Sequence, residues 1–406
     1  MDAVVFSAVL IYYWGLEYAV GPTDEVVRGG LLYFLFVAPI AAFSLMFLCS
    51  AIGVKRFGKP AWLMLVYGFI VTTIAVLRSD LATAATVTLF ACTAAAIFGW
   101  RLVPSARLLN ALFVASIPLG AAAYSLGISI YSVLPGYSLD GELWWRVSLF
   151  PQVAPSAYFA LIVLFVNMMD REAPGRRWLI PLAMYFLVFS GLRSALFAAG
   201  LGGGYQFLVG RGMLKTTHGR MTYVFGALLA FVVFLLSSQL FLLIPSLGNE
   251  TANVYLFRSA GGLQSSADAV RTIYRTWIWS EHLRLAAQNP LFGIGTFDFL
   301  ALSNINPILD ATSRGSESFL TGLYARVGLP TLLLLWSILS AIKQGVDVDS
   351  HLHLVIGLFV FEAMLAYGSF MNPYDFVFLL MLGLLAPRLP QPKLARCPVP
   401  LIPAVT

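Results

Sequence analysis

Charged residues are scarce in this sequence of 406 residues. Asp, Glu, Lys and Arg together make up 11%, against about 25% in soluble globular proteins. Hydrophobic residues make up 59%, and the mean hydropathy is +0.84. A chain of this composition has too few polar groups to cover its own apolar surface in water. The scarcity of charge therefore excludes a soluble globular protein and predicts a polytopic membrane protein.

Cysteine and histidine are also rare, with three and four residues. Three cysteines are too few for a disulfide framework. No outward cluster of two carboxylates at short spacing is present, so the sequence predicts neither a catalytic metal nor a cofactor. The start of the chain lacks a basic segment followed by a cleavage site, so we expect the first apolar run to be a span and not a removed signal peptide. The net charge of +6 is not a nucleic-acid signal, because basic residues in membrane proteins are distributed relative to the spans.

Apolar runs long enough to be membrane spans recur along the chain. A bilayer core about 30 Å thick requires roughly 20 helical residues. The sequence predicts an all-α protein with about twelve transmembrane helices, near residues 3–20, 30–51, 61–77, 81–100, 108–130, 152–169, 177–191, 194–210, 221–244, 318–342, 352–370 and 375–387. The glycine-rich stretch at 201–204 weakens the eighth of these spans.

The distribution of basic residues predicts the orientation. With a cytoplasmic N-terminus, fifteen of the 25 Lys and Arg residues fall in inward loops and the tail. The short outward loops hold only Arg28, Arg78, Arg146 and Arg193. Loops facing the cytoplasm carry such an excess of Lys and Arg. We therefore expect both termini to be cytoplasmic.

These spans divide the chain into four parts. Residues 1–244 are expected to form a bundle of spans one to nine, and 245–317 a large outer loop. Residues 318–387 hold spans ten to twelve, and 388–406 form a cytoplasmic tail. Residues 131–150, with two adjacent tryptophans, are predicted to be an interfacial helix or a loop lying on the membrane. A loop as long as 245–317 in an otherwise economical chain usually carries function.

Within this loop, residues 268–288 have the apolar period of an amphipathic helix. Arg271 and Arg275 lie one turn apart on another face, which Trp279 and His282 continue. Two guanidinium groups about 5–6 Å apart suit a pyrophosphate, since arginine binds phosphate through paired donors. The alternative is a solvated polar face without a ligand.

The helix is followed by Asn289-Pro290-Leu291-Phe292-Gly293-Ile294-Gly295. Asn-Pro is expected to end the helix, and the two glycines permit a tight turn. The segment is not a P-loop, because no Gly-Lys-Ser/Thr follows, and it is not a dinucleotide fingerprint, because no strand precedes it. Alone, it is typical of a turn without chemistry.

Taken together, several segments resemble the bacterial O-antigen polymerase/ligase superfamily (Wzy/WaaL type). They are Arg275-x-x-x-Trp279, the segment 289–295, Gly328-Leu329-Pro330 and the earlier Ser190-Gly191-Leu192-Arg193-Ser194-Ala195. The resemblance implies a GT-C-like integral-membrane glycosyltransferase of the bacterial inner membrane. It further implies inverting transfer of a glycan from a lipid pyrophosphate, without a metal, at the periplasmic face.

The resemblance also implies roles for individual residues. Arg193 and Arg275 match the two arginines that handle the donor pyrophosphate, and Arg271 would assist them. The family histidine lies eleven residues before the glycine of Gly-Leu-Pro, a position that Glu317 occupies here. Glu317 is therefore expected to accept the proton of the acceptor hydroxyl, although it could instead only stabilise a helix start. The remaining substrate-binding candidates are Arg314, Trp279, His282, Tyr324 and Arg326.

Two charges are predicted within the spans. Arg326 lies about two turns into span ten, and Glu362 lies at a similar depth in span eleven. Unpaired charge in hydrocarbon is costly, so an ion pair between them is expected, either structural or lining the acceptor path.

The leading hypothesis is a polysaccharide polymerase whose donor and acceptor are both lipid-linked oligosaccharides. A ligase that moves the finished glycan to lipid A core or protein is the alternative within the same chemistry, and the resemblance also implies a chain-length regulator as partner. A transporter is the alternative of another class. Transporters usually bind their substrate at the midplane between inverted repeats, whereas the polar candidates here gather at the outer face.

Overall fold

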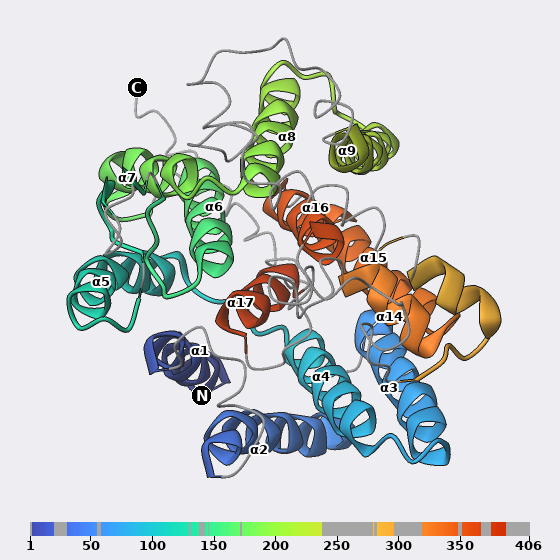
Figure 1. The fold of residues 1–406 in the computed structure, drawn as a ribbon. Coiled ribbons are helices and arrows are strands. Elements are labelled where there is room, and N and C mark those ends of the chain that lie inside the picture. Colours follow the sequence, from blue (N-terminus) through green and yellow to red (C-terminus); the bar gives the residue numbers. More distant parts are fainter. Residues whose placement is uncertain are drawn as a thin grey trace, which may run out of the picture.

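The computed structural model describes most of the apolar segments. The described residues are 2–19, 31–54, 58–129, 131–137, 143–144, 146–170, 173–237, 279, 282–295, 319–347, 351–366 and 375–386. In this part of the chain the protein is all-helical apart from one pair of two-residue strands (Figure 1). The predicted all-α class is confirmed.

The helices coincide with the predicted apolar segments to within a few residues at most ends. They are α1 (Asp2–Ala19), α2 (Leu31–Val54), α3 (Lys59–Leu77), α4 (Leu81–Trp100), α5 (Ala106–Ser125), α6 (Val153–Met169), α7 (Arg176–Phe189), α8 (Arg193–Gly210), α9 (Thr217–Ser237), α14 (Phe319–Val327), α15 (Thr331–Asp347), α16 (His351–Ala366) and α17 (Phe376–Leu385). The tenth predicted span is wrong as a single helix, because α14 and α15 are separated at residues 328–330.

Three helical segments among the described residues are long and apolar enough to cross a membrane. They are Lys59–Leu77, Thr83–Trp100 and Ala106–Ser125. Other apolar helices are shorter; α17 has 10 residues, which is about 15 Å of helix. The total of twelve spans stays a prediction.

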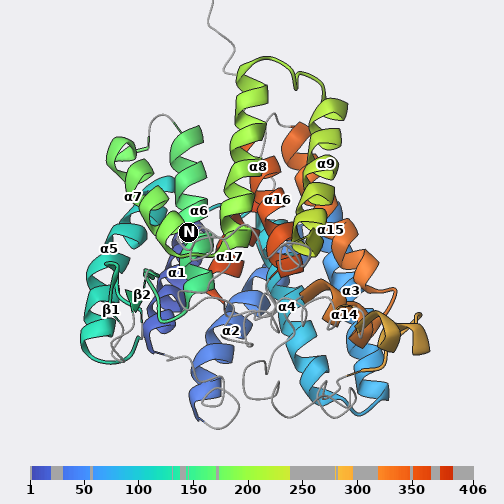
Figure 2. The same ribbon diagram turned by 45° about the horizontal axis from the view of Figure 1, so that its top comes forward.

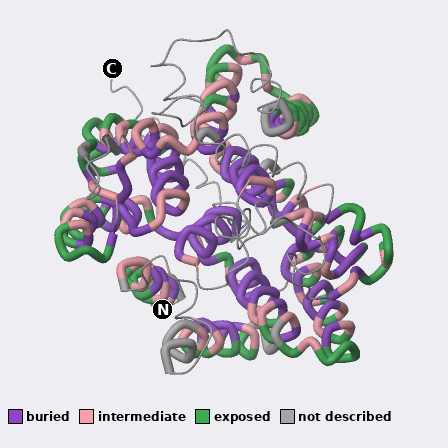
Figure 3. Tube along the Cα trace, viewed as in Figure 1, coloured by how far each residue is buried: buried purple, intermediate pink, exposed green. Residues whose placement is uncertain are grey.

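The core of the bundle lies around α17, which is in the centre of the view in Figure 1. All ten residues of α17 are buried, and α6 and α16 are buried along most of their length (Figure 3). Phe376 contacts Phe159 and Phe150 with edge-on rings, with centroids 5.1 and 6.2 Å apart. Because α17 has no polar face, contact with water would destabilise it. The neighbouring helices cover it instead.

The described residues of the segment 131–150 form no helix but a pair of short strands. β1 (Gly136–Tyr137) pairs antiparallel with β2 (Leu143–Trp144) beside α5 (Figure 2). After β2 the chain turns inward, and residues 147–150 are buried. A side chain on Gly120 of α5 would approach the carbonyl oxygen of Leu149 to 2.8 Å. Residues 147–150 therefore pack against the bundle. The side chains of residues 138–145 lie outside the described part of the chain, so the interfacial element stays a prediction.

The glycine-rich stretch does not interrupt the eighth helix. α8 runs without a break through residues 201–204. A Cβ on Gly202 would lie 2.7 Å from Phe165 of α6 and 3.1 Å from Phe359 of α16. The glycines allow close packing of these helices, as small residues commonly do in membrane bundles.

A pair of buried amides joins α5 to α6. Asn110 Nδ2 donates to Asn167 Oδ1 at 3.0 Å, and Asn167 Nδ2 donates to Asn110 Oδ1 at 2.8 Å. Each amide also donates to a backbone carbonyl, of Pro174 and Val163 respectively. The pair therefore satisfies its polar groups inside an apolar interface.

We expect Asn110→Ala to lower the stability of the purified protein by about 0.6–2 kcal/mol, the range for hydrogen bonds between membrane helices. Asn167→Ala should have a similar effect, because either change leaves one buried amide half-paired. The thermal unfolding midpoints of both variants and of the double variant measure the coupling. A double variant that loses the full sum of the two effects would show that the amides act independently.

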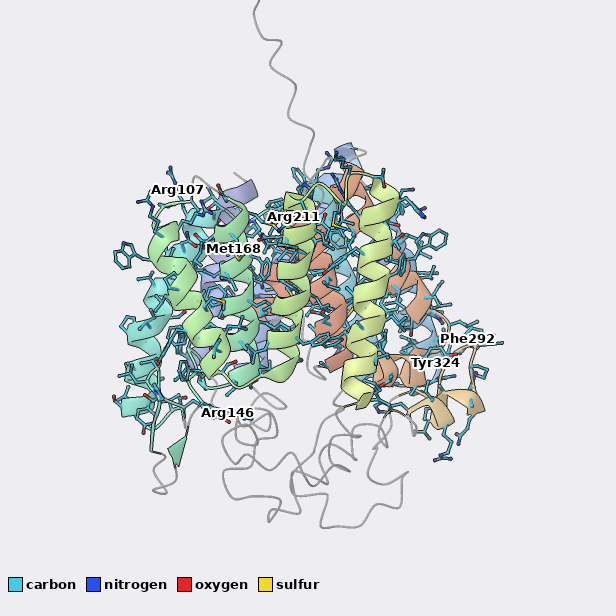
Figure 4. The ribbon with its side chains drawn as sticks, turned by 90° about the horizontal axis from the view of Figure 1, so that it is seen from above. Arg107, Arg146, Met168, Arg211, Phe292 and Tyr324 are labelled. Atoms are coloured by element: carbon cyan, nitrogen blue, oxygen red, sulfur yellow. The ribbon has the colours of Figure 1, made fainter. Side chains whose placement is uncertain are left out.

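Basic side chains mark the two ends of the bundle. Arg107 and Arg211 lie at one end and Arg146 at the opposite end, and Phe292 and Tyr324 lie in the half that contains Arg146 (Figure 4). We call this half the Arg146 end. Residues that the charge distribution predicts on opposite sides of a membrane thus lie at opposite ends of the molecule.

Candidate functional site

The predicted site residues are divided between described and undescribed parts of the chain. Arg271, Arg275, Arg314 and Glu317 lie outside the described residues. Arg193 is the first residue of α8 and is described by its backbone only. Tyr324 and Arg326 lie on α14, and His282 lies within hydrogen-bond distance of Thr321 on the same helix. Trp279 is described as a half-buried helical residue.

The segment 282–295 forms a short helix and a compact turn. Residues 282–288 are helical, and the helix ends before Pro290, as predicted. The Asn289 carbonyl accepts a hydrogen bond from the Gly293 N–H at 2.7 Å, and its side-chain oxygen accepts one from the Phe292 N–H at 3.3 Å. Asn289 thus closes the turn with both its backbone and its side chain, which is a common role for asparagine.

This turn is bound to the end of α14 by close backbone contact. Ile294 N–H donates to the Ala325 carbonyl at 2.8 Å, and Gly295 N–H donates to the Arg326 carbonyl at 3.0 Å. Gly293 and Gly328 have φ of +65° and +67°, and a Cβ on Gly328 would lie 2.6 Å from the nitrogen of Gly293. We call the contact of Gly293 with Gly328 the glycine clamp. It joins the segment 289–295 to Gly-Leu-Pro, although more than 30 residues separate them in the sequence.

His282 links the short helix to α14. The His282 Nδ1 and the Thr321 Oγ1 are 3.0 Å apart, and the histidine is buried. A small apolar cluster of Leu285, Ala286 and Ala325 lies next to this hydrogen bond, with Tyr324 packed against it. The geometry gives His282 a positioning role between the two helices, and its contact with a substrate stays a prediction.

Trp279 carries a polar group that is not satisfied. Its indole N–H is buried and has no hydrogen-bond partner among the residues that the structure describes. Leaving such a donor unpaired costs about 1–3 kcal/mol. Buried orphan donors of this kind are rare, and this one is available to an oxygen atom of a ligand.

Arg326 does not form the predicted ion pair with Glu362. Its described electrostatic partner is Asp80, in the turn between α3 and α4. Burial lowers the pKa of the Arg326 guanidinium, and the attraction of the Asp80 carboxylate raises it. α14 has nine residues, about 14 Å of helix, which is too short to cross a bilayer. The prediction failed because it assumed one unbroken helix from 318 to 342.

Glu362 is instead enclosed within the bundle. It is fully buried in α16, and neither carboxylate oxygen has a hydrogen-bond partner among the described residues. An ionised carboxylate in such surroundings is strongly disfavoured.

The turn between α3 and α4 is a part of the site that sequence reasoning missed. Arg78 Nη1 donates to the Phe292 carbonyl at 3.2 Å. A Cβ on Gly295 would lie 3.7 Å from this guanidinium and 3.9 Å from Asp80 Oδ2. Asp80 also caps α4 by accepting a hydrogen bond from the Thr83 N–H at 3.1 Å. The sequence predicts Arg78 in an outward loop. It gives no sign of the contact with Phe292, which lies more than 200 residues away.

The described part of the site offers hydrogen-bond donors and cations. Arg78 and Arg326 supply guanidinium groups, and Trp279 supplies an unpaired N–H. Over the described ranges, no group of three or more His, Cys, Asp or Glu residues has the arrangement of a metal site. Arg326 faces Asp80, and Arg78 already donates to the Phe292 carbonyl. The Trp279 N–H is therefore the described donor that suits an oxygen atom of a ligand.

Comparison with known proteins gives no assignment. No family model and no curated protein matches the sequence.

Proposed function

We propose that this protein is a membrane-embedded polysaccharide polymerase. It would transfer a growing glycan from undecaprenyl pyrophosphate to a second lipid-linked repeat unit, at the periplasmic face of a bacterial inner membrane. The proposal includes the GT-C-like arrangement of about twelve spans with both termini in the cytoplasm. Its substrates are thus a lipid-linked donor and a lipid-linked acceptor.

The observation that supports this proposal most is the glycine clamp. Two segments that were singled out by their resemblance to the same enzyme superfamily are in direct backbone contact at the Arg146 end. The clamp fixes the turn at 289–295 against α14, and His282 joins the preceding short helix to the same element. Within the described part of the chain, the Trp279 N–H has no hydrogen-bond partner.

The proposed reaction is a single displacement at C1 of the donor sugar. The acceptor hydroxyl oxygen forms the new bond to C1 as the bond from C1 to the diphosphate oxygen breaks. The bonding electrons leave with the diphosphate, and the hydroxyl proton passes to Glu317. Arg193 and Arg275 stabilise the charge that grows on the leaving oxygen, so that no metal is required. Attack from the opposite face inverts the configuration at C1.

Product analysis tests this proposal. Purified protein incubated with a single lipid-linked repeat unit is expected to produce a ladder of oligomers separated by one repeat unit. A ligase would instead leave the substrate unchanged until a core or protein acceptor is added. If the substrate stays unchanged with every acceptor, the transferase proposal is wrong.

A further inference from the structure

Arg146 occupies a well-defined position at its end of the bundle. It follows β2 and is half-buried at the end opposite Arg107 and Arg211 (Figure 4). The N–H of the next residue, Val147, donates to the carbonyl of Phe189 at 2.9 Å, which is the last residue of α7. Val147 is fully buried. The backbone at Arg146 is therefore fixed to the end of α7.

The side chain of Arg146 crosses the turn between α7 and α8. Gly191 lies in this turn with φ of +64°. A Cβ placed on Gly191 would be 3.4 Å from Arg146 Nε and 3.5 Å from Arg146 Cγ. The stem of the arginine thus lies on the glycine backbone, and α8 begins two residues later at Arg193.

The guanidinium of Arg146 is a candidate for binding an anion. No carboxylate among the residues described in the structure forms an ion pair with it. Arginine provides five N–H donors in a planar group that matches the oxygens of a phosphate. A half-buried guanidinium held by its stem loses little freedom when it binds such a group.

We infer that Arg146 binds a phosphate of the lipid diphosphate, next to the position of Arg193. The inference rests on the proposed function, which supplies the ligand class. It adds a third cationic residue, from a segment that the motif resemblance does not include. The contacts that hold Arg146 are present before any ligand binds. Arg146 would therefore bind the diphosphate both before and during the transfer.

Binding measurements test this inference separately from activity. The full-length protein in detergent would be titrated with inorganic pyrophosphate and, in a second arm, with a polyprenyl pyrophosphate. Arg146→Ala is expected to raise both dissociation constants about tenfold, as the loss of a charged hydrogen bond does. Arg107→Ala, at the opposite end, should change neither. Unchanged constants for Arg146→Ala, or weaker binding of the polyprenyl ligand alone, would overturn the inference.

A second variant keeps the test valid if the alanine variant does not fold. Arg146→Lys retains the charge and most of the stem but loses the paired donors. Relative to wild type, Arg146→Lys is expected to weaken binding of both ligands, but by less than Arg146→Ala does. If Arg146→Ala does not fold, wild-type affinity of Arg146→Lys for both ligands would overturn the inference, because the paired donors are then not used. A protein that binds pyrophosphate through Arg146 but forms no oligomer ladder would contradict only the proposed polymerase function.

Discussion

Gly328→Ala is expected to destabilise the protein by about 2–5 kcal/mol. The left-handed conformation of Gly328 costs an alanine about 1–2 kcal/mol, and overpacking adds about 1–3 kcal/mol. The new Cβ would lie 2.6 Å from Gly293 N and 2.7 Å from the Pro290 carbonyl oxygen. These are backbone atoms that cannot rotate away. The turn at 289–295 must therefore separate from α14, and we expect enzymatic activity to fall with it.

Substitutions at two other glycines distinguish the cost of a left-handed backbone from the cost of a close contact. Gly127 has φ of +71° but no atom within 4 Å of a Cβ, so Gly127→Ala carries only the strain of about 1–2 kcal/mol. Gly203 lies in α8 with open space around its Cβ, and Gly203→Ala should be neutral or stabilising by about 0.5–1 kcal/mol. Thermal unfolding of the purified variants is expected to show the largest loss of stability for Gly328→Ala, a smaller loss for Gly127→Ala and none for Gly203→Ala. If Gly328→Ala and Gly127→Ala have equal effects, the glycine clamp is not a close contact.

The helices could be predicted well from sequence because their signals are local. Lys59–Leu77 and Leu81–Trp100 match the predicted segments closely. Pro60 is compatible with the first turn of a helix, and Asp80 caps the next helix, so both boundaries are encoded within a few residues. Such signals do not depend on the rest of the chain.

The break between α14 and α15 could not be predicted from local pattern. Apolar residues continue through both helices, and Gly328-Leu329-Pro330 resembles a tolerated irregularity within a span. The break is stabilised by contacts with Pro290, Leu291 and Gly293, which lie far away in the sequence. The expected pair of Arg326 with Glu362 failed for the same reason, since depth was counted along a continuous helix.

The burial of the residues that follow Arg146 could not be predicted from their composition. Adjacent tryptophans and an arginine are typical of a membrane interface. Burial of residues 147–150 instead depends on hydrogen bonds within the segment and with the start of α6. Ser148 Oγ donates to the Phe150 carbonyl at 2.6 Å, and Ser156 Oγ accepts from the Leu149 N–H at 2.8 Å. Serine in an apolar run gives no sign of these partners before the fold is known.

Arginine substitution has the largest expected effect on catalysis. In the proposed reaction, Arg193→Ala or Arg275→Ala would remove a cation that stabilises the departing diphosphate. Loss of one such donor typically lowers the rate about 10²–10³-fold. Lysine at either position should restore part of the rate, because it keeps the charge but not the paired hydrogen bonds. Arg211→Ala is the matched control, since Arg211 lies at the end of the bundle opposite Arg146.

The most direct test of the central claim is the rate at which purified protein releases polyprenyl pyrophosphate from a lipid-linked repeat unit. The account predicts release of one lipid pyrophosphate for each glycosidic bond formed by the wild type and by Arg211→Ala. It predicts a rate lower by about 10²–10³-fold for Arg193→Ala and Arg275→Ala, with the proteins still folded. Wild-type rates of release in both folded alanine variants would contradict it.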